Sequence, residues 1–361
     1  MPTLRLPANP DLRHLKHQAR DLLNAQRRGD RAALQRLREF HPRFAAASDD
    51  TIAAARLALN DALFSIAREY GFPSWPALKA FVETPARPSL DAPFHERIQD
   101  PAFRKAVDLL DAGDANGLHA HLHAHPQVVH QRVRFDGGNY FRNPALLEFV
   151  AENPVRRGTL PPSIVEAARV VLDAGAAQDR ASADSALELV CSGRVARECG
   201  VQTALIDLLC EYGADPNAAM SAALAHGEFE AAERLIARGA RIDLPVAAAT
   251  GRTAEALRSL ATAGVEERHR AIALAAQFGR LPIVRALLDA GEDPNRYNPP
   301  GFHSHSTPLH QAALNGHLDV VQLLIANGAD PTIRDVMYQG TPLGWAEYGR
   351  QAAVADFLRT L

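Results

Sequence analysis

A pattern that closes helices recurs along this chain, and it constrains the fold more than any other feature of the sequence. Two adjacent large apolar residues, such as Leu287-Leu288, are followed a few residues later by a glycine. A glycine at that place ends a helix by adopting a left-handed conformation. Successive glycines of the pattern lie 25 to 38 residues apart, which leaves room for two helices and their turns. They are Gly175, Gly213, Gly239, Gly264, Gly291 and Gly328. The sequence therefore predicts an all-α stack of helix pairs.

The clearest copy of the repeat is Thr307–Asp335, which reads TPLHQAALNGHLDVVQLLIANGADPTIRD. Thr307 is suited to cap a first helix, and Pro308 fits the first helical position, where its missing N–H costs nothing. Gly316 is expected to end this helix, and Gly328 to end the second. The second helix has an apolar stripe, made of Val320, Val321, Leu323 and Leu324.

This segment resembles the ankyrin repeat, and Gly340-Thr341-Pro342-Leu343 begins a further copy. The chain as a whole is similar to bacterial ankyrin-repeat proteins that carry an N-terminal helical region. The resemblance implies an α-solenoid of helix pairs with short hairpin loops, called fingers below. It implies that His310 bonds to the backbone of its repeat. It also implies an extended concave groove that holds a protein partner.

Composition shifts divide the chain into three parts. Residues 1–83 are predicted to form an N-terminal helical region of degenerate helix pairs, with helices capped by Asp30, Asp50 and Ser74. Residues 84–93, TPARPSLDAP, contain three prolines and are predicted to be a linker. The array of repeats then occupies residues 94–361.

Charge and hydropathy exclude several classes of partner. The net charge of −3 argues against a broad nucleic-acid footprint. No apolar stretch is long enough for a transmembrane helix, and the N-terminus lacks the apolar segment of a secretory signal. Three cysteines cannot form a disulfide framework. We therefore expect a cytoplasmic protein that binds neither nucleic acid nor membrane.

No enzyme or metal-site motif is present in the sequence. The densest titratable cluster is the four alternating histidines of residues 119–125, but no cysteine or carboxylate nearby completes a metal-ligand set. We predict no catalytic residues, no metal and no cofactor. This absence does not exclude an enzyme, because a site can be built on any fold.

Two fingers depart from the repeat pattern and are the candidate binding loops. Residues 136–143 and residues 297–306 concentrate aromatic, amide, arginine and histidine side chains, which binding loops favour. The candidates are Asn139, Tyr140 and Arg142 in the first finger, and Tyr297, Asn298, His303 and His305 in the second. If both fingers lean over one groove, these side chains face a common space.

Glu148 is the eighth candidate, because alignment with the repeat places it where Ala312 stands. A carboxylate at a packing position needs a partner or water. The sequence thus predicts a scaffold that binds a protein through its groove and fingers. The alternative is a small-molecule-binding protein or an enzyme with a site built from the two long fingers.

Overall fold

The computed structural model describes residues 4–7, 10–83, 92–136 and 140–361. These residues form α-helices α1 to α21 and several short 3-10 helices. Within the described ranges there is no β-strand, only an isolated bridge between Arg132 and Ala145. The predicted all-α fold is confirmed. None of the helices in these ranges is both long enough and apolar enough to span a bilayer.

The chain separates into two compact units, Pro88–Arg241 and a discontinuous unit of Met1–Arg87 with Ile242–Leu361. The first is called the central unit here, and the second the terminal unit. Of the predicted linker, residues 84–91 lie outside the described residues. The proposed division at residues 83 and 93 therefore stays a prediction.

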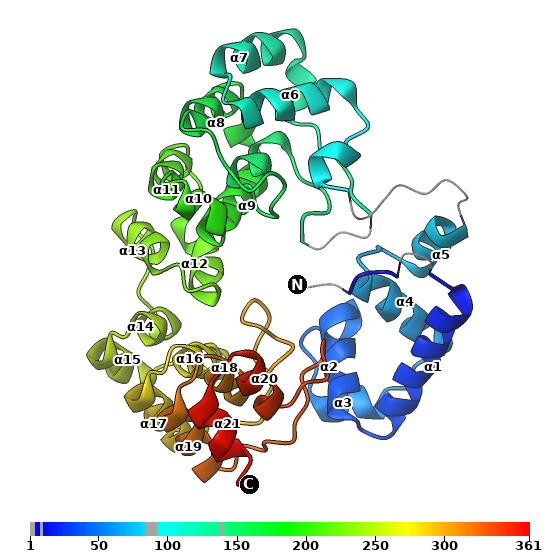
Figure 1. The fold of residues 1–361 in the computed structure, drawn as a ribbon, viewed down its shortest axis with the longest axis vertical. Coiled ribbons are helices and arrows are strands. Elements are labelled where there is room, and N and C mark those ends of the chain that lie inside the picture. The colour runs from blue at the N-terminus through cyan, green and yellow to red at the C-terminus, as the bar shows by residue number, and fades with distance from the viewer. Residues whose placement is uncertain (1–3, 8–9, 84–91, 137–139) are drawn as a thin grey trace. The chain divides into compact units, whose positions relative to one another are not determined.

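The central unit consists of helix pairs stacked in two layers (Figure 1). The first helices of the pairs pack on one another, and so do the second helices. The first-helix layer contains α6 (Pro101–Ala112), the 3-10 helix η4 (Leu146–Ala151), α9 (Arg180–Cys191) and α12 (Pro216–Ala225). The second-helix layer contains α7 (Ala115–Ala124), α8 (Ile164–Asp173), α11 (Gln202–Glu211) and α13 (Phe229–Ala237). Helix α10 (Arg194–Glu198) lies in the insertion between α9 and α11.

The terminal unit continues the same arrangement in its C-terminal part. Its first helices are α14 (Leu244–Thr250), α16 (Val265–Gln277), α18 (Pro308–Leu314) and α20 (Pro342–Tyr348). Its second helices are α15 (Thr253–Leu260), α17 (Leu281–Asp289), α19 (Leu318–Ala326) and α21 (Ala352–Leu358). Alanines of the first helices are almost fully buried, among them Ala248, Ala275, Ala312 and Ala346. Their small side chains let neighbouring helices approach closely.

The repeat at Thr307–Gly328 has the predicted anatomy. Thr307 is the N-cap of α18, and Pro308 is its first residue. Gly316 follows the end of α18 with φ +78°, and Gly328 follows α19 with φ +87°. The positive φ at Gly316 is a backbone conformation that residues with a β-carbon rarely adopt, so glycine is favoured at this position.

The N-terminal helices form their own hydrophobic cluster within the terminal unit. They are α1 (Leu12–Arg27), α2 (Arg31–Phe40), α3 (Asp49–Ala54), α4 (Leu59–Glu69) and α5 (Trp75–Glu83). Asp30 caps α2 as predicted. The prediction of a helix that is capped by Asp50 and continues to Tyr70 was wrong. Ser48 caps the short α3, and the chain leaves helical geometry at Ala55 before α4 begins.

We expect the segment Leu244–Gly264 to be the less stable part of the terminal unit's array. Leu257 is 46% exposed, whereas Leu324, in the second helix of the Thr307–Gly328 repeat, is fully buried. A large side chain left in water forfeits on the order of 1 kcal/mol or more of burial free energy. Amide hydrogen exchange should therefore be faster in Leu244–Gly264 than in Thr307–Gly328. Equal protection of the two segments would contradict this expectation.

Candidate functional site

The finger at residues 297–306 is a closed loop whose ends are bonded to each other. The Asn298 amide donates to the Ser306 carbonyl at 2.8 Å, and the Ser306 amide donates to the His303 carbonyl at 3.0 Å. Tyr297 is only 9% exposed, and its hydroxyl donates to the Arg334 carbonyl at 2.7 Å. Burial raises the pKa of Tyr297 to about 12. This finger is a packed element of the terminal unit.

Asn298 and His303 have different surroundings in this finger. Asn298 is almost fully buried, yet its amide oxygen and nitrogen find no hydrogen-bond partner among the described residues. His303 is half-buried and has φ +59°, a conformation that is uncommon for residues other than glycine. Its ring lies 6.1 Å from the His305 ring, centroid to centroid.

His305 belongs to an aromatic cluster that joins this finger to the next repeat. Its ring centroid lies 5.6 Å from that of Trp345 and 6.1 Å from that of Tyr338. Burial lowers the pKa of His305 to about 4, and the neighbouring His303 acts in the same direction. The imidazole is therefore neutral at pH 7.

His310 bonds to the backbone of its repeat as the resemblance implied. Its Nδ1 accepts the Thr307 amide at 3.3 Å, and its Nε2 lies 3.2 Å from the Gly340 carbonyl. Because Nδ1 accepts, the proton of the neutral ring is on Nε2, which donates to Gly340. Burial lowers the pKa of His310 to about 4, and a second proton on Nδ1 would face the Thr307 N–H.

A buried carboxylate shapes the following finger, residues 335–340. Asp335 is fully buried, and its oxygens accept the amides of Met337, Tyr338 and Gly340. It also accepts the Trp345 indole N–H at 3.0 Å. The loop therefore holds Tyr338 at the surface, 71% exposed. The sequence analysis missed Tyr338, although alignment of Thr341 with Thr307 would have placed it in a finger.

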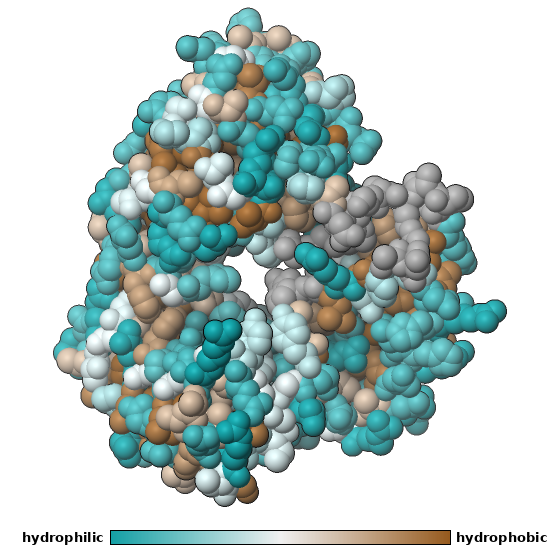
Figure 2. Space-filling view, in the orientation of Figure 1, coloured by the Kyte–Doolittle hydropathy of each residue, from teal (hydrophilic) through white to brown (hydrophobic). Residues whose placement is uncertain are grey.

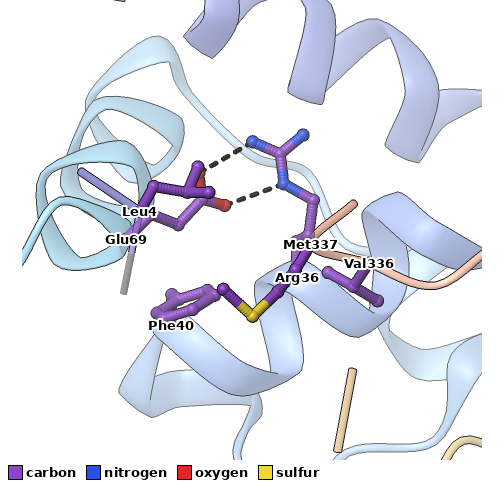
Figure 3. Close-up of a pocket in the computed structure, with 6 residues that line it drawn as sticks. All are labelled: Leu4, Arg36, Phe40, Glu69, Val336 and Met337. Atoms are coloured by element: carbon purple, nitrogen blue, oxygen red, sulfur yellow. Dashed lines mark hydrogen bonds and ion pairs between the residues drawn. The ribbon is translucent and has the colours of Figure 1, made fainter. Parts of the chain in front are cut away.

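Helix α2 contacts both of these fingers inside the terminal unit. The Gln35 side-chain amide is buried and donates to the Ser304 carbonyl at 2.9 Å. Figure 3 shows Val336 and Met337 of the later finger facing Arg36 and Phe40 of α2 around a small hollow. Other residues of the N-terminal region, Leu4 and Glu69, complete the lining of this hollow. The Arg36 guanidinium is paired with the Glu69 carboxylate at 2.8 Å.

The other long finger lies in the central unit and is a true hairpin. The Val133 amide donates to the Pro144 carbonyl at 3.0 Å, and the Phe135 amide donates to the Arg142 carbonyl at 2.8 Å. Tyr140 is 51% exposed, and its hydroxyl donates to the Asn153 side chain. Arg142 is half-buried and takes part in contacts within the unit. Asn139 lies outside the described residues.

Glu148 is buried at the start of η4 and bonded entirely within the central unit. Its carboxylate accepts the Ala145 amide at 2.6 Å and the Ser185 hydroxyl at 2.6 Å. Arg132 is its ionic partner at 3.7 Å. The carboxylate thus has the hydrogen-bond and ionic partners that its buried position requires.

A second buried charge cluster fixes the insertion that follows η4, and the sequence analysis did not identify it. The Arg156 guanidinium pairs with both oxygens of Asp111, at 2.7 and 2.9 Å, and with Glu152 at 2.9 Å. All three side chains are at most 4% exposed. Glu152 also accepts backbone amides of the loop, including that of Arg156 at 2.6 Å. Only the fold brings Asp111 to this loop, so no local spacing could have revealed the cluster.

The remaining titratable groups suggest no chemistry of their own. The His121 Nε2 lies 2.8 Å from the Ala102 carbonyl, and its ring packs against His125. Across the described residues, no three metal-ligating side chains come together in a group that could hold an ion. Burial raises the pKa of the Cys191 thiol, which keeps it protonated.

The candidate residues thus fall in two separate units. Tyr297, Asn298, His303 and His305 lie in the terminal unit, and Tyr140, Arg142 and Glu148 in the central one. The common space between the two fingers therefore stays a prediction. On the face shown in Figure 2, the described surface is mainly hydrophilic, with apolar patches between the polar side chains.

We predict that acid destabilises the terminal unit through its buried histidines. His305 and His310 have pKa values near 4 in the fold, against about 6.5 when unfolded. Between these values the unfolded chain binds more protons, so stability falls as the pH drops from 6.5 towards 4. At pH 5 each histidine should cost about 2 kcal/mol relative to pH 7.5.

The measurement is urea unfolding at pH 7.5 and 5.0, followed by Trp345 fluorescence in a Trp75→Phe background. His310→Asn removes one titrating group, so its free energy of unfolding should change less between the two pH values. An unchanged pH dependence in this variant would contradict the assignment, whatever its stability at pH 7.5.

We also predict that Glu148→Ala destabilises the central unit by about 2 to 3 kcal/mol, because it leaves a buried amide and two hydroxyls without their charged acceptor. Glu347→Ala is the matched control. Glu347 is exposed and pairs only with Arg359 at the surface, so its loss should cost at most about 1 kcal/mol. Thermal unfolding followed by circular dichroism checks both values, and similar effects of the two substitutions would refute the structural role of Glu148.

Comparison with known families finds repeats in the C-terminal part of the chain. Residues 220–335 and 272–359 match the family described as "Ankyrin repeats (3 copies)". Human ankyrin repeat domain-containing protein 49 is 48% identical over 61 residues, which are 17% of this chain and 24% of that protein. Cyclin-dependent kinase 4 inhibitor B from Bos taurus is 38% identical over 90 residues, which are 25% of this chain and 60% of that protein.

A third relative is the serine/threonine-protein kinase VIK of Arabidopsis thaliana, 38% identical over 77 residues, which are 21% of this chain and 17% of that protein. The matches span 60% or less of the length of these three relatives. Together with the stacked helix pairs, the comparisons show that residues 220–359 of this chain carry ankyrin repeats.

Proposed function

We propose that this protein is a scaffold that binds a protein partner through the concave face and fingers of its repeats. The observation that carries the proposal is the ankyrin array itself, since stacked repeats of this kind present an extended surface suited to protein contacts. One relative, cyclin-dependent kinase 4 inhibitor B, has a name that describes action on another protein.

The exposed aromatic residues of the fingers support protein contact. Tyr338 and Tyr140 are 71% and 51% exposed, and hydrogen bonds to the buried Asp335 carboxylate hold the finger that carries Tyr338. Tyrosine presented on a rigid loop is a typical hot-spot residue, because it offers a large contact area at low cost in conformational entropy. We therefore add Tyr338 to the binding residues proposed from the sequence.

The cellular location, the bacterial source and the individual binding residues are proposed from the sequence. We propose a cytoplasmic, bacterial protein whose binding residues include Tyr140, Arg142, His303 and His305. Asn139, Tyr297, Asn298 and Glu148 complete the proposed set. In the described structure Tyr297, Asn298, His305 and Glu148 are buried, so their contribution would be to hold the fingers in shape.

The alternative function, a small-molecule site or an enzyme built from both long fingers, has less support. The described contacts of Tyr297, His305 and Tyr140 are made to side chains and carbonyls of their own units. Those contacts explain why the fingers contain these tyrosine and histidine residues, and the explanation requires no bound ligand.

The experiment is affinity capture from the native host, with the full chain as bait, followed by mass spectrometry. Tyr338→Ala should reduce capture of a specific partner at least tenfold, since loss of a hot-spot tyrosine costs roughly 2 kcal/mol. Tyr140→Ala tests the other finger in the same way.

Leu257→Ala is the matched control, because Leu257 is an exposed apolar residue on α15, a second helix rather than a finger. It should leave capture unchanged. Equal capture by the wild type and both tyrosine variants would refute binding through the fingers. Equal losses in all three variants would indicate a nonspecific apolar contact and would also refute it.

A further inference from the structure

The contact between α2 and the fingers has an unusual composition for the interior of a repeat protein. Its central bond joins the Gln35 side chain to the Ser304 carbonyl, and both residues are at most 4% exposed. The Ser304 side chain also bonds to the Glu39 carboxylate. Helix α2 thus supplies hydrogen-bond partners to polar groups of the finger that would otherwise bond to water.

A small apolar contact lies beside these polar bonds. Phe40 of α2 faces Val336 and Met337 of the later finger, and all three line a small hollow (Figure 3). The two fingers are linked here, because the Val336 amide donates to the His305 carbonyl at 2.8 Å. Residues 303–306, Val336 and Met337 therefore form one continuous surface, which we call the finger surface. Helix α2 packs against this surface.

The fit of α2 on this surface is incomplete. The Oε2 atom of Glu39 is buried and has no hydrogen-bond partner among the described residues. Burying a carboxylate oxygen without a partner costs free energy, and a hollow forfeits packing contacts. Both features weaken the contact relative to the hydrophobic core that α2 shares with α1 and α4. The N-terminal helices therefore hold together more strongly than they hold the fingers.

We propose that the finger surface is a helix-binding site, and that α2 is its built-in occupant, which outside helices must displace. The surface suits an amphipathic helix with a carboxamide four residues before a carboxylate, as in Gln35 and Glu39, followed by an aromatic residue. This inference refines the proposed function, because it assigns the class of partner segment and the element that competes with it.

The test uses the full chain and a fluorescein-labelled synthetic peptide of residues 28–45, which contains α2. Gln35→Glu in the chain replaces the donor to Ser304 with a carboxylate facing that carbonyl, and should release α2. Fluorescence anisotropy should then show the wild-type peptide binding to this variant at least tenfold more tightly than to the wild-type chain. A peptide that carries the same Gln35→Glu change should bind neither the wild-type chain nor the variant chain.

The matched control is Gln26→Glu. Gln26 is an equally buried glutamine, but its amide donates to the carbonyls of Ile52, Ala53 and Ala55 inside the N-terminal region. Hydrogen exchange separates the two cases. Gln35→Glu should raise exchange of the Asn298, Ser306 and Val336 amides at least tenfold while α4 stays protected, whereas Gln26→Glu should loosen the N-terminal region first.

Met337→Glu probes the contact from the finger side and leaves the sequence of the N-terminal helices unchanged. It should release α2 and raise exchange at the same amides, yet bind no peptide, because the surface itself is altered. The inference is overturned if the peptide binds the wild-type and Gln35→Glu chains equally. It is also overturned if the finger amides exchange freely in Gln35→Glu but the peptide does not bind.

The peptide needs no cellular partner, so the two proposals fail separately. If the peptide result holds and the tyrosine variants capture the same proteins as the wild type, binding through the exposed tyrosines is wrong and the helix site stands. If tyrosine-dependent capture holds and the peptide result fails, the scaffold function stands without α2 as a competitor.

Discussion

Close packing between the first helices of successive repeats is the constraint on which the rest of this structure depends. Alanines such as Ala248, Ala275 and Ala312 are fully buried where these helices meet. Their small side chains bring the helix axes together, and this places each finger next to the following one. Glu148 is the informative exception. A carboxylate replaces the alanine there, and the site holds it with the Ala145 amide and two serine hydroxyls.

The fingers of the terminal unit are then held by buried polar groups. His310 connects Thr307 to Gly340, and Asp335 gathers three amides and the Trp345 indole. Each group bridges two consecutive repeats or a finger and a helix. This network keeps Tyr338 exposed on an ordered loop, a geometry that favours protein contact. The neutral state of His310 is part of the network, since a second proton on its ring would meet the Thr307 N–H.

The long insertions of the two units are held in place by different kinds of contact. In the central unit, Arg156 is buried between Asp111 and Glu152, and this salt-bridge cluster holds the insertion after η4 against α6. In the terminal unit, α2 contacts the longer finger through Gln35 and the later finger through Phe40. Removing one member of the first cluster would leave a buried charge unpaired, whereas the second contact includes a carboxyl oxygen, Glu39 Oε2, without a hydrogen-bond partner among the described residues.

The sequence by itself determined the repeat and its local chemistry. The caps Thr307 and Asp30, the helix ends at Gly316 and Gly328, and the backbone role of His310 all depend on residues close together in the chain or on a strong repeat pattern. The break between α3 and α4 was not foreseen, because alanine-rich sequence favours helix on both sides of it. Only the tertiary structure decided the surroundings of the candidate site. Gln35 meets Ser304 across 269 residues of sequence, and Arg156 meets Asp111 across 45. Contacts at such separations follow from how helices stack, and no local spacing encodes them.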